Sequence, residues 1–141
     1  MNKVNASLGF FLDLAKIQAV MARKFDGKLN GLSLSDFMIL YRLSLAEGGK
    51  LRRIDLAEQI GLTASGVTRL LLPMEKVGLV KRQSNEHDAR VSFVMLAPGG
   101  KRKLEEAMER AGLFADEILQ PEKNKRLAEL SGLLSDLAKS F

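Results

Sequence analysis

Residues 51–100 read LRRIDLAEQIGLTASGVTRLLLPMEKVGLVKRQSNEHDARVSFVMLAPGG, and this stretch decides the fold. Its first part places Ile54, Leu56, Ala57 and Ile60 near the 3.6-residue period of a helix, so we expect one buried face. Gly61 follows directly, and glycine is the common residue just past the C-terminus of a helix. The pattern predicts a short helix that ends in a tight turn at Gly61.

A second helix is predicted to begin after this turn. Thr63 is a suitable N-cap, because its hydroxyl can accept a hydrogen bond from a backbone N–H of the first turn. Helical spacing then divides the following side chains into two faces. The apolar residues expected to face inward are Val67, Leu70, Leu71 and Met74. The polar or cationic residues expected to face outward are Ser65, Thr68, Arg69 and Lys76.

A β-hairpin is predicted downstream of the two helices. Its strands, Leu79 to Gln83 and Val91 to Leu96, enclose a polar tip from Ser84 to Arg90. Two short helices followed by such a hairpin have the order of a winged helix-turn-helix with a two-stranded wing. In helix-turn-helix proteins the second helix enters the DNA major groove, with its N-terminal residues toward the base edges. The order of elements therefore favours a DNA-binding protein.

Helices are also predicted on the N-terminal side of this stretch. An apolar stripe from about Val4 to Leu29 is typical of a long amphipathic helix, which Gly31 interrupts. Ser33 and Asp36 then have the spacing of a capping box, so a further helix is expected to start there. We expect it to end at residues 47–49, where a glutamate is followed by two glycines.

The C-terminal side has the same character. Pro98 suits the first turn of a long helix, Pro121 interrupts that helix, and a leucine-rich helical pattern follows. Apolar faces of this size at both chain ends favour a two-fold dimer. We therefore predict a mainly α fold of the α+β class: an N-terminal dimerisation helix (1–32), a winged helix-turn-helix lobe (33–100) and C-terminal dimerisation helices (101–141).

Charge and composition support this division. The chain of 141 residues has a net charge of +5, and residues 50–103 hold eleven basic side chains against five acidic ones, a net charge of +6. The predicted lobe therefore carries the excess positive charge, which favours a polyanionic partner. The chain has no cysteine, which excludes disulfides and thiol-based redox sensing. Without an apolar run of membrane-spanning length or a secretory signal pattern, we expect a cytoplasmic protein without membrane contact.

Four short motifs occur in order along the chain. They are Leu56-Ala57 with Ile60-Gly61-Leu62-Thr63, Val67-Thr68-Arg69-Leu70, Met74-Glu75-Lys76 with Gly78-Leu79-Val80, and Asp88-Ala89-Arg90 with Val94, Leu96 and Gly100. These motifs resemble those of the MarR family of winged helix-turn-helix transcriptional regulators. The resemblance implies a homodimeric repressor on a pseudo-palindromic operator. It also implies release from DNA by a small lipophilic or aromatic ligand.

Some residues depart from the family pattern. Pro73 stands where a polar or basic residue is usual, and it removes the hydrogen bond to the Arg69 carbonyl, so we expect a late kink in the second helix. Gly66 weakens that helix by about 1 kcal/mol relative to alanine but lets the backbone approach a phosphate. Ala97 replaces a usual threonine, and His87 occupies a position often held by arginine.

The predicted DNA contacts lie on the second helix, the wing and the start of the first helix. Arg69 is expected to bind guanine through both guanidinium prongs, which contributes about 1–3 kcal/mol of base discrimination. The resemblance implies that Arg90 reaches the minor groove or a phosphate while Asp88 holds it; the alternative is an ordinary surface ion pair. The full predicted set is Thr63, Ser65, Gly66, Thr68, Arg69, Lys76, Arg82, His87, Asp88, Arg90, Arg52 and Arg53. The alternative for Arg69 is a solvated helix residue, and for Lys76, Arg82, Arg52 and Arg53 it is solubilising surface charge.

A small-molecule effector would enter between the dimerisation helices and the lobe, as the resemblance implies. The candidate walls of that pocket, which could equally be core residues, are Phe10, Leu14, Phe37, Tyr41 and Met108. We expect no metal site, no cofactor and no catalytic centre, because the sole histidine, His87, lies at the wing tip without evident ligand or nucleophile partners.

Two other function classes are compatible with the same residues. One is a winged-helix module for protein contact, or an accessory subunit, whose basic face binds an acidic partner. The other is an architectural DNA binder without sequence preference. Salt dependence and sequence selectivity separate the three, because specific binding withstands competitor DNA and weakens steeply as salt rises.

Overall fold

The computed structural model describes residues 3–88 and 90–141. Its elements, in chain order, are α1 (Ala6–Lys24), α2 (Leu34–Leu45), the 3-10 turn η1 (Glu47–Gly49), β1 (Lys50–Arg52), α3 (Arg53–Ile60), α4 (Ala64–Lys76), β2 (Val80–Ser84), β3 (Ser92–Leu96), α5 (Pro98–Leu119) and α6 (Leu127–Ala138). In the described ranges, no helix has the length and apolarity needed to cross a membrane.

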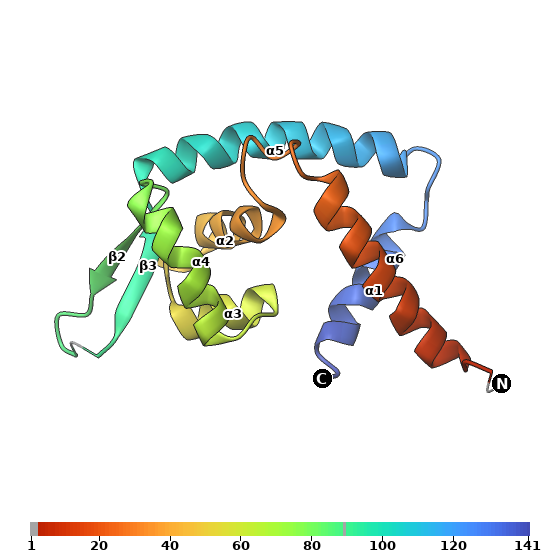
Figure 1. Ribbon diagram of the computed structural model, residues 1–141, viewed down its shortest axis with the longest axis horizontal. Coiled ribbons are helices and arrows are strands. Elements are labelled where there is room, and N and C mark those ends of the chain that lie inside the picture. The colour runs from red at the N-terminus through yellow and green to blue at the C-terminus, as the bar shows by residue number, and fades with distance from the viewer. Residues whose placement is uncertain (1–2, 89) are drawn as a thin grey trace.

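The long helix α5 connects two groups of elements (Figure 1). The first group lies along the N-terminal half of α5 and contains α2, α3, α4 and the sheet; we call it the winged lobe. The second group lies at the C-terminal end of α5 and contains α1 and α6; we call it the terminal arm. This arrangement confirms the predicted winged helix-turn-helix between terminal helices.

One apolar core holds the winged lobe together. Within α4, Val67, Leu71 and Met74 are buried as predicted, and Leu70 is half-buried. The buried side chains that the other elements contribute to this core include Ile39, Leu40 and Leu43 from α2, Leu56 and Ala57 from α3, Val94 from β3, and Leu104 and Ala107 from α5. Leu29 and Leu32, which precede α2, are buried in the same core.

Ile54 corrects the predicted buried face of α3. Its side chain is 62% exposed, whereas Leu56 and Ala57 are buried and Ile60 is half-buried. The reason is angular: two residues along a helix turn the side chain through about 200°, so Ile54 and Leu56 lie on opposite sides.

The predicted caps and turns are present. The Ser33 Oγ accepts a hydrogen bond from the Asp36 N–H at 3.1 Å, and the Thr63 Oγ1 accepts one from the Gly66 N–H at 3.1 Å. Gly61 has φ of +75°, the left-handed conformation that ends α3 and turns the chain toward α4. These local signals set the starts of α2 and α4 and the end of α3.

The sheet has one more strand than the sequence predicted. Its order is β1-β3-β2, and both pairings are antiparallel. The hairpin of β2 and β3 is the predicted wing, and β1 adds Leu51 opposite Val94 on the other edge. The three residues of β1 include two cations and run directly into α3, so their sequence has no apolar alternation long enough to indicate a strand.

The terminal helices also differ in length from the prediction. α1 ends at Lys24 rather than near Leu29, because Gly27, Asn30 and Gly31 adopt positive φ values that lead the chain back to the lobe. The apolar spacing in the sequence continues past the end of α1 because Leu29 is needed in the lobe core, not on the face of α1. At the other end, Pro98 is in the first turn of α5, and α5 ends at Leu119, just before Pro121, as expected.

Gly100 fixes the start of α5 against the lobe. A Cβ atom at this position would overlap the backbone carbonyl of Leu79, which is also the acceptor of the Ala97 N–H at 3.0 Å. We therefore expect Gly100→Ala to lower the free energy of unfolding by about 1–3 kcal/mol, the usual cost of overpacking. Urea denaturation at fixed protein concentration measures this change.

The matched control for Gly100→Ala is Gly112→Ala. Gly112 lies within the same helix, and a Cβ there would have no heavy atom within 4 Å. Replacing it should raise the free energy of unfolding by about 0.5–1 kcal/mol, because alanine loses less conformational freedom in a helix than glycine. Equal midpoints for Gly100→Ala and the parent protein would contradict the close approach of α5 to Leu79.

Candidate nucleic-acid interface

The outward face of α4 is polar and cationic. Ser65, Arg69 and Lys76 are exposed, and the buried side of the helix holds it on the lobe core. Within the described part of the chain, neither Arg69 nor Lys76 forms an ion pair. Their charges are therefore available to an external anion.

Thr68 is held by two hydrogen bonds. Its Oγ1 donates to the Ala64 carbonyl at 3.0 Å and accepts from the Arg53 Nη1 at 3.0 Å. The Arg53 guanidinium thus links the first residue of α3 to α4. The hydroxyl of Thr68 is neutral, so Arg53 keeps its full positive charge beside the second helix. The sequence placed both residues in the DNA-contact set but did not reveal that they bind each other.

A basic hollow of about 320 Å³ lies between α3, α4 and the wing. Its lining includes Arg52, Arg53, Ser65 and Arg90, four of the predicted contact residues. The Arg52 Nε is 2.8 Å from the Asp55 Oδ2, and this hydrogen bond lowers the pKa of the Asp55 carboxyl. Arg90 is likewise paired with Asp88, whereas Arg53 is bonded to a neutral hydroxyl. The three arginines and two carboxylates together keep a net positive charge, which suits a phosphate.

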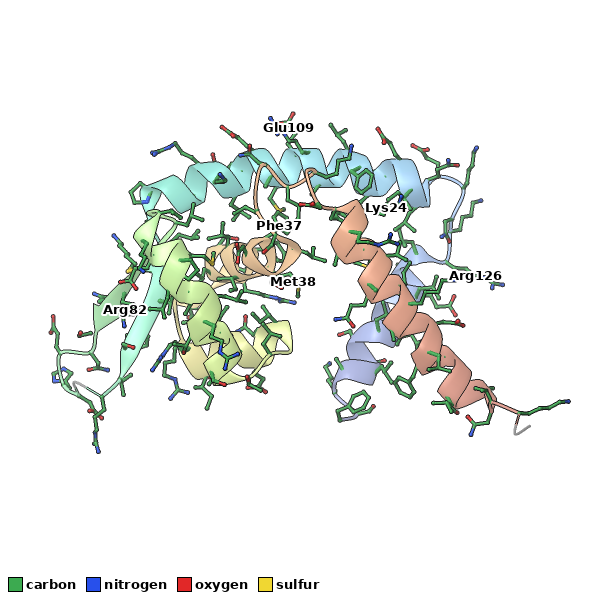
Figure 2. All side chains as sticks on the ribbon, viewed as in Figure 1. Lys24, Phe37, Met38, Arg82, Glu109 and Arg126 are labelled. Atoms are coloured by element: carbon green, nitrogen blue, oxygen red, sulfur yellow. The ribbon has the colours of Figure 1, made fainter. Side chains whose placement is uncertain are left out.

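Arg82 is bound to a carboxylate on α4. Its Nε lies 3.1 Å from the Glu75 Oε2 and 3.3 Å from the Glu75 Oε1. The pairing joins β2 to the last turn of the second helix, and Arg82 lies where β2 runs beside α4 (Figure 2). Arg82 was predicted to contact DNA, and its pairing with Glu75 was not predicted.

The tip of the wing is organised by Asn85 and Asp88. The Asn85 Oδ1 accepts hydrogen bonds from the backbone N–H of His87 at 2.8 Å and of Asp88 at 3.3 Å. The Asp88 Oδ1 accepts from the Arg90 Nε at 3.1 Å and from the Arg90 N–H at 3.0 Å. These bonds lower the pKa of the Asp88 carboxyl, with the side-chain bond contributing most. Ala89, part of the quoted motif, lies outside the described residues.

Arg90 itself points away from the body of the wing. Its side chain is 91% exposed even though Asp88 holds its Nε. The pair therefore fixes the direction of the guanidinium without burying it. An exposed arginine that donates to Asp88 fits both interpretations made from the sequence, a contact to a groove or phosphate and an ordinary surface ion pair, so the DNA contact stays a prediction.

Two departures from the family pattern have a local structural outcome. The N–H of Gly66 is bonded to the Thr63 Oγ1, and a Cβ at Gly66 would lie 3.1 Å from that oxygen, so the glycine leaves room for the cap. Pro73 lies inside α4, and the helix continues beyond it to Lys76. The proline therefore does not end the helix.

The five candidate pocket residues do not share one of the observed hollows. Phe10 and Leu14 lie on α1 in the terminal arm, whereas Phe37 and Tyr41 are half-buried against the lobe core. Met108 lines a hollow of about 620 Å³ between α2, β3 and α5. The ligand pocket thus stays a prediction.

The alternation of side chains along β2 is a sequence signal for the position of Arg82. Side chains alternate between the faces of a strand, so Arg82 shares a face with the buried Val80, two residues earlier. That face packs on α4, which places Arg82 near the end of that helix. The contact between Arg53 and Thr68 is different, since the two residues are separated by a helix and a turn and no short-range pattern connects them.

The amino-acid sequence is similar to those of known transcriptional regulators. Residues 32–92 match the model of the MarR family. FarR of Neisseria gonorrhoeae, an HTH-type transcriptional regulator, is 29% identical over 128 residues, which cover 91% of this chain and 88% of FarR. The matched family segment covers the two helices of the motif and the wing as far as Ser92.

Solved structures are similar over the whole chain. The transcriptional regulator BldR from Sulfolobus solfataricus superposes with a TM-score of 0.85 and 28% identity, covering 100% of both chains. NadR, solved in complex with 4-hydroxyphenylacetate, superposes with a TM-score of 0.80 and 26% identity, covering 99% of both chains. The similarity therefore extends from the winged lobe to the terminal arm.

Proposed function

This chain belongs to the MarR family of winged helix-turn-helix regulators, and from that premise we propose that it represses transcription by binding double-stranded DNA as a cytoplasmic homodimer. One observation carries the proposal: α4 buries Val67, Leu71 and Met74 in the lobe and turns Ser65 and Arg69 to solvent. A helix packed in this way is suited to enter the major groove. Arg69 then binds guanine through both prongs of its guanidinium.

The homodimer is supported by the apolar surface of the terminal arm. The large apolar side chains that are at least about two-fifths exposed in the arm and at the end of α5 include Ile17, Met21, Ile118, Leu130, Leu133 and Leu134. Surfaces of this kind favour association. A two-fold axis through the arm presents two copies of α4 to one face of DNA about 34 Å apart, so the operator is an inverted repeat.

Repression follows from occupancy of the operator, and a small lipophilic or aromatic ligand relieves it. NadR supports this part of the proposal, because a similar protein was solved with an aromatic acid. The ligand must bind more tightly to the dimer arrangement that does not fit DNA. By linkage, DNA then weakens ligand binding by the same coupling free energy.

Selection from a random DNA pool tests the proposed function. The purified protein is mixed with the pool and excess competitor DNA at physiological salt, and the bound duplexes are sequenced. Enrichment of an inverted repeat with half-sites about one turn apart is expected. Binding without enrichment would identify a non-specific DNA binder, and absence of binding would favour a protein-contact module.

Arg90→Ala is expected to weaken binding to all duplexes by a similar factor. The exposed guanidinium contacts phosphate or the minor groove without distinguishing most sequences, so its loss removes a salt-dependent contact. The slope of log K against log salt should become shallower by about 0.9 for each protomer bound. Fluorescence anisotropy at several salt concentrations measures the slope.

Arg90→Lys is the matched control, because it keeps the positive charge at the wing tip. We expect it to retain most of the salt slope of the parent protein. If Arg90→Ala lowered affinity for the selected operator and left affinity for an unrelated duplex unchanged, Arg90 would be a base-reading residue and its assignment would be wrong.

A further inference from the structure

The ion pair between Arg82 and Glu75 lies at the edge of the proposed DNA-binding surface. In the register of the sheet, Arg82 is opposite Val94, which is fully buried, so both residues lie on the face of the sheet that packs on α4. Both oxygens of Glu75 are within 3.3 Å of the Arg82 Nε. The pair therefore binds the start of the wing to the second helix.

The position of Glu75 is electrostatically unfavourable for the helix that carries it. Glu75 lies in the last turn of α4, where the unpaired carbonyl groups give the helix end a partial negative charge. Acidic residues stabilise helix starts and basic residues stabilise helix ends. The carboxylate thus gains its favourable interaction from Arg82 and not from α4.

Arg53, like Arg82, is bonded to a side chain of α4, but its partner is of a different kind. A notch along one side of α4 is lined by Arg53 and Thr68 at one end and by Glu75 and Arg82 at the other. Arg53 is held by a neutral hydroxyl, whereas Arg82 is paired with a carboxylate. The Arg82 side chain is also less exposed than that of Arg90, the other arginine paired within the wing, at 55% against 91%. Both Arg53 and Arg82 lie beside α4, but Arg53 and Thr68 together carry one positive charge, whereas Arg82 and Glu75 together carry none.

We propose that Glu75 withholds Arg82 from DNA phosphates and thereby limits the sequence-independent part of the affinity for DNA. This inference rests on the proposed function, and it removes Arg82 from the set of DNA contacts predicted from sequence. Phosphate contacts strengthen binding to every duplex. Withholding such a contact therefore lowers the affinity for operator and non-operator DNA by a similar factor and leaves the ratio of the two affinities unchanged.

Glu75→Gln is the central test. The amide keeps the size of the side chain but frees Arg82 to bind a phosphate, so affinity for both the operator and an unrelated duplex should rise. Each protomer bound should steepen the slope of log K against log salt by about 0.9, which widens the ratio of affinities at 50 and 200 mM salt by about three- to fourfold. Fluorescence anisotropy with both duplexes over this salt range provides the readout.

Two further variants separate the release of Arg82 from a general change of charge. Glu109→Gln removes the same charge from α5 on the side away from the lobe, and it should leave the slope unchanged (Figure 2). The double variant Glu75→Gln/Arg82→Ala should return the slope to that of the parent. An equally steep slope in the double variant would overturn the proposal, because the effect would not come from Arg82.

Arg82→Ala alone tests the proposal without altering Glu75. An arginine withheld from DNA contributes no phosphate contact, so the slope should stay at the parent value or become shallower by less than the change for Arg90→Ala. Weaker binding by Glu75→Gln would overturn the inference, since it would mean that Glu75 presents Arg82 to DNA. If the parent bound no duplex, the proposed function would fail; if the parent bound and Glu75→Gln matched it, only this inference would fail.

Discussion

The double substitution Leu130→Asp/Leu134→Asp is expected to convert the dimer into a monomer and to lower operator affinity by about 10²–10⁴-fold. The two leucines are four residues apart on α6, on one face of the helix, and are 47% and 48% exposed. Carboxylates at these positions would be buried without partners in an apolar interface, which is strongly unfavourable. Each monomer would then bind one half-site and lose the additional affinity that simultaneous binding of the second half-site provides.

Light scattering after size-exclusion chromatography measures the mass, and anisotropy with the selected operator measures the affinity. Leu45→Asp is the matched control, because Leu45 is 60% exposed at the end of α2, in the winged lobe rather than the terminal arm. It should leave the mass unchanged. A double variant that remained dimeric would show that α6 does not form the interface. A monomer with parental affinity would show that tight binding to the operator does not require a dimer.

Arg69→Ala is expected to remove most of the sequence selectivity while the protein stays dimeric. The guanidinium is exposed on α4 beside the N-terminal turns of the helix and has no ion-pair partner within the described residues. Loss of a bidentate contact to guanine costs about 1–3 kcal/mol in each half-site. Two half-sites together lose about 2–6 kcal/mol, so affinity for the operator should fall by about 30-fold or more, whereas affinity for an unrelated duplex should change little.

The ratio of the two affinities is the quantity to measure, again by anisotropy. Arg110→Ala removes the same charge from an exposed position on α5 and should preserve the ratio. If Arg69→Ala retained the parental ratio, α4 would not be the helix that reads the bases at this position, and the assignment of the recognition helix would be wrong.

The parts of the fold that were predictable are those with short-range causes. Thr63 and Ser33 cap helices because each hydroxyl meets an N–H three residues ahead, and Gly61 ends α3 because it adopts a positive φ. Pro98 begins α5 for a comparable reason, since its ring suits the first turn. Each of these signals depends only on a few consecutive residues, and a sequence displays them directly.

The features that escaped prediction depend on contacts between distant segments. β1 exists because its three residues pair with β3, more than forty residues later. Apolar spacing alone extended α1 to Leu29, although that side chain is buried against other elements of the lobe. Within the candidate site, the bond between Arg53 and Thr68 follows from the packing of α3 on α4. Such pairings appear only when the chain is folded.

The continuity of α5 gives the molecule a lever. Its 22 residues form a rod about 33 Å long. Gly100 lies against the Leu79 carbonyl at one end, and nearer the other end Phe114 contacts Phe25, the residue that follows α1, with 5.0 Å between ring centres. A stiff rod converts angle into displacement, so a tilt of about 5° at the arm moves the far end by about 3 Å. In the proposed dimer, the distance between the two lobes would therefore depend on small rotations at the terminal arm, away from the proposed DNA-binding surface.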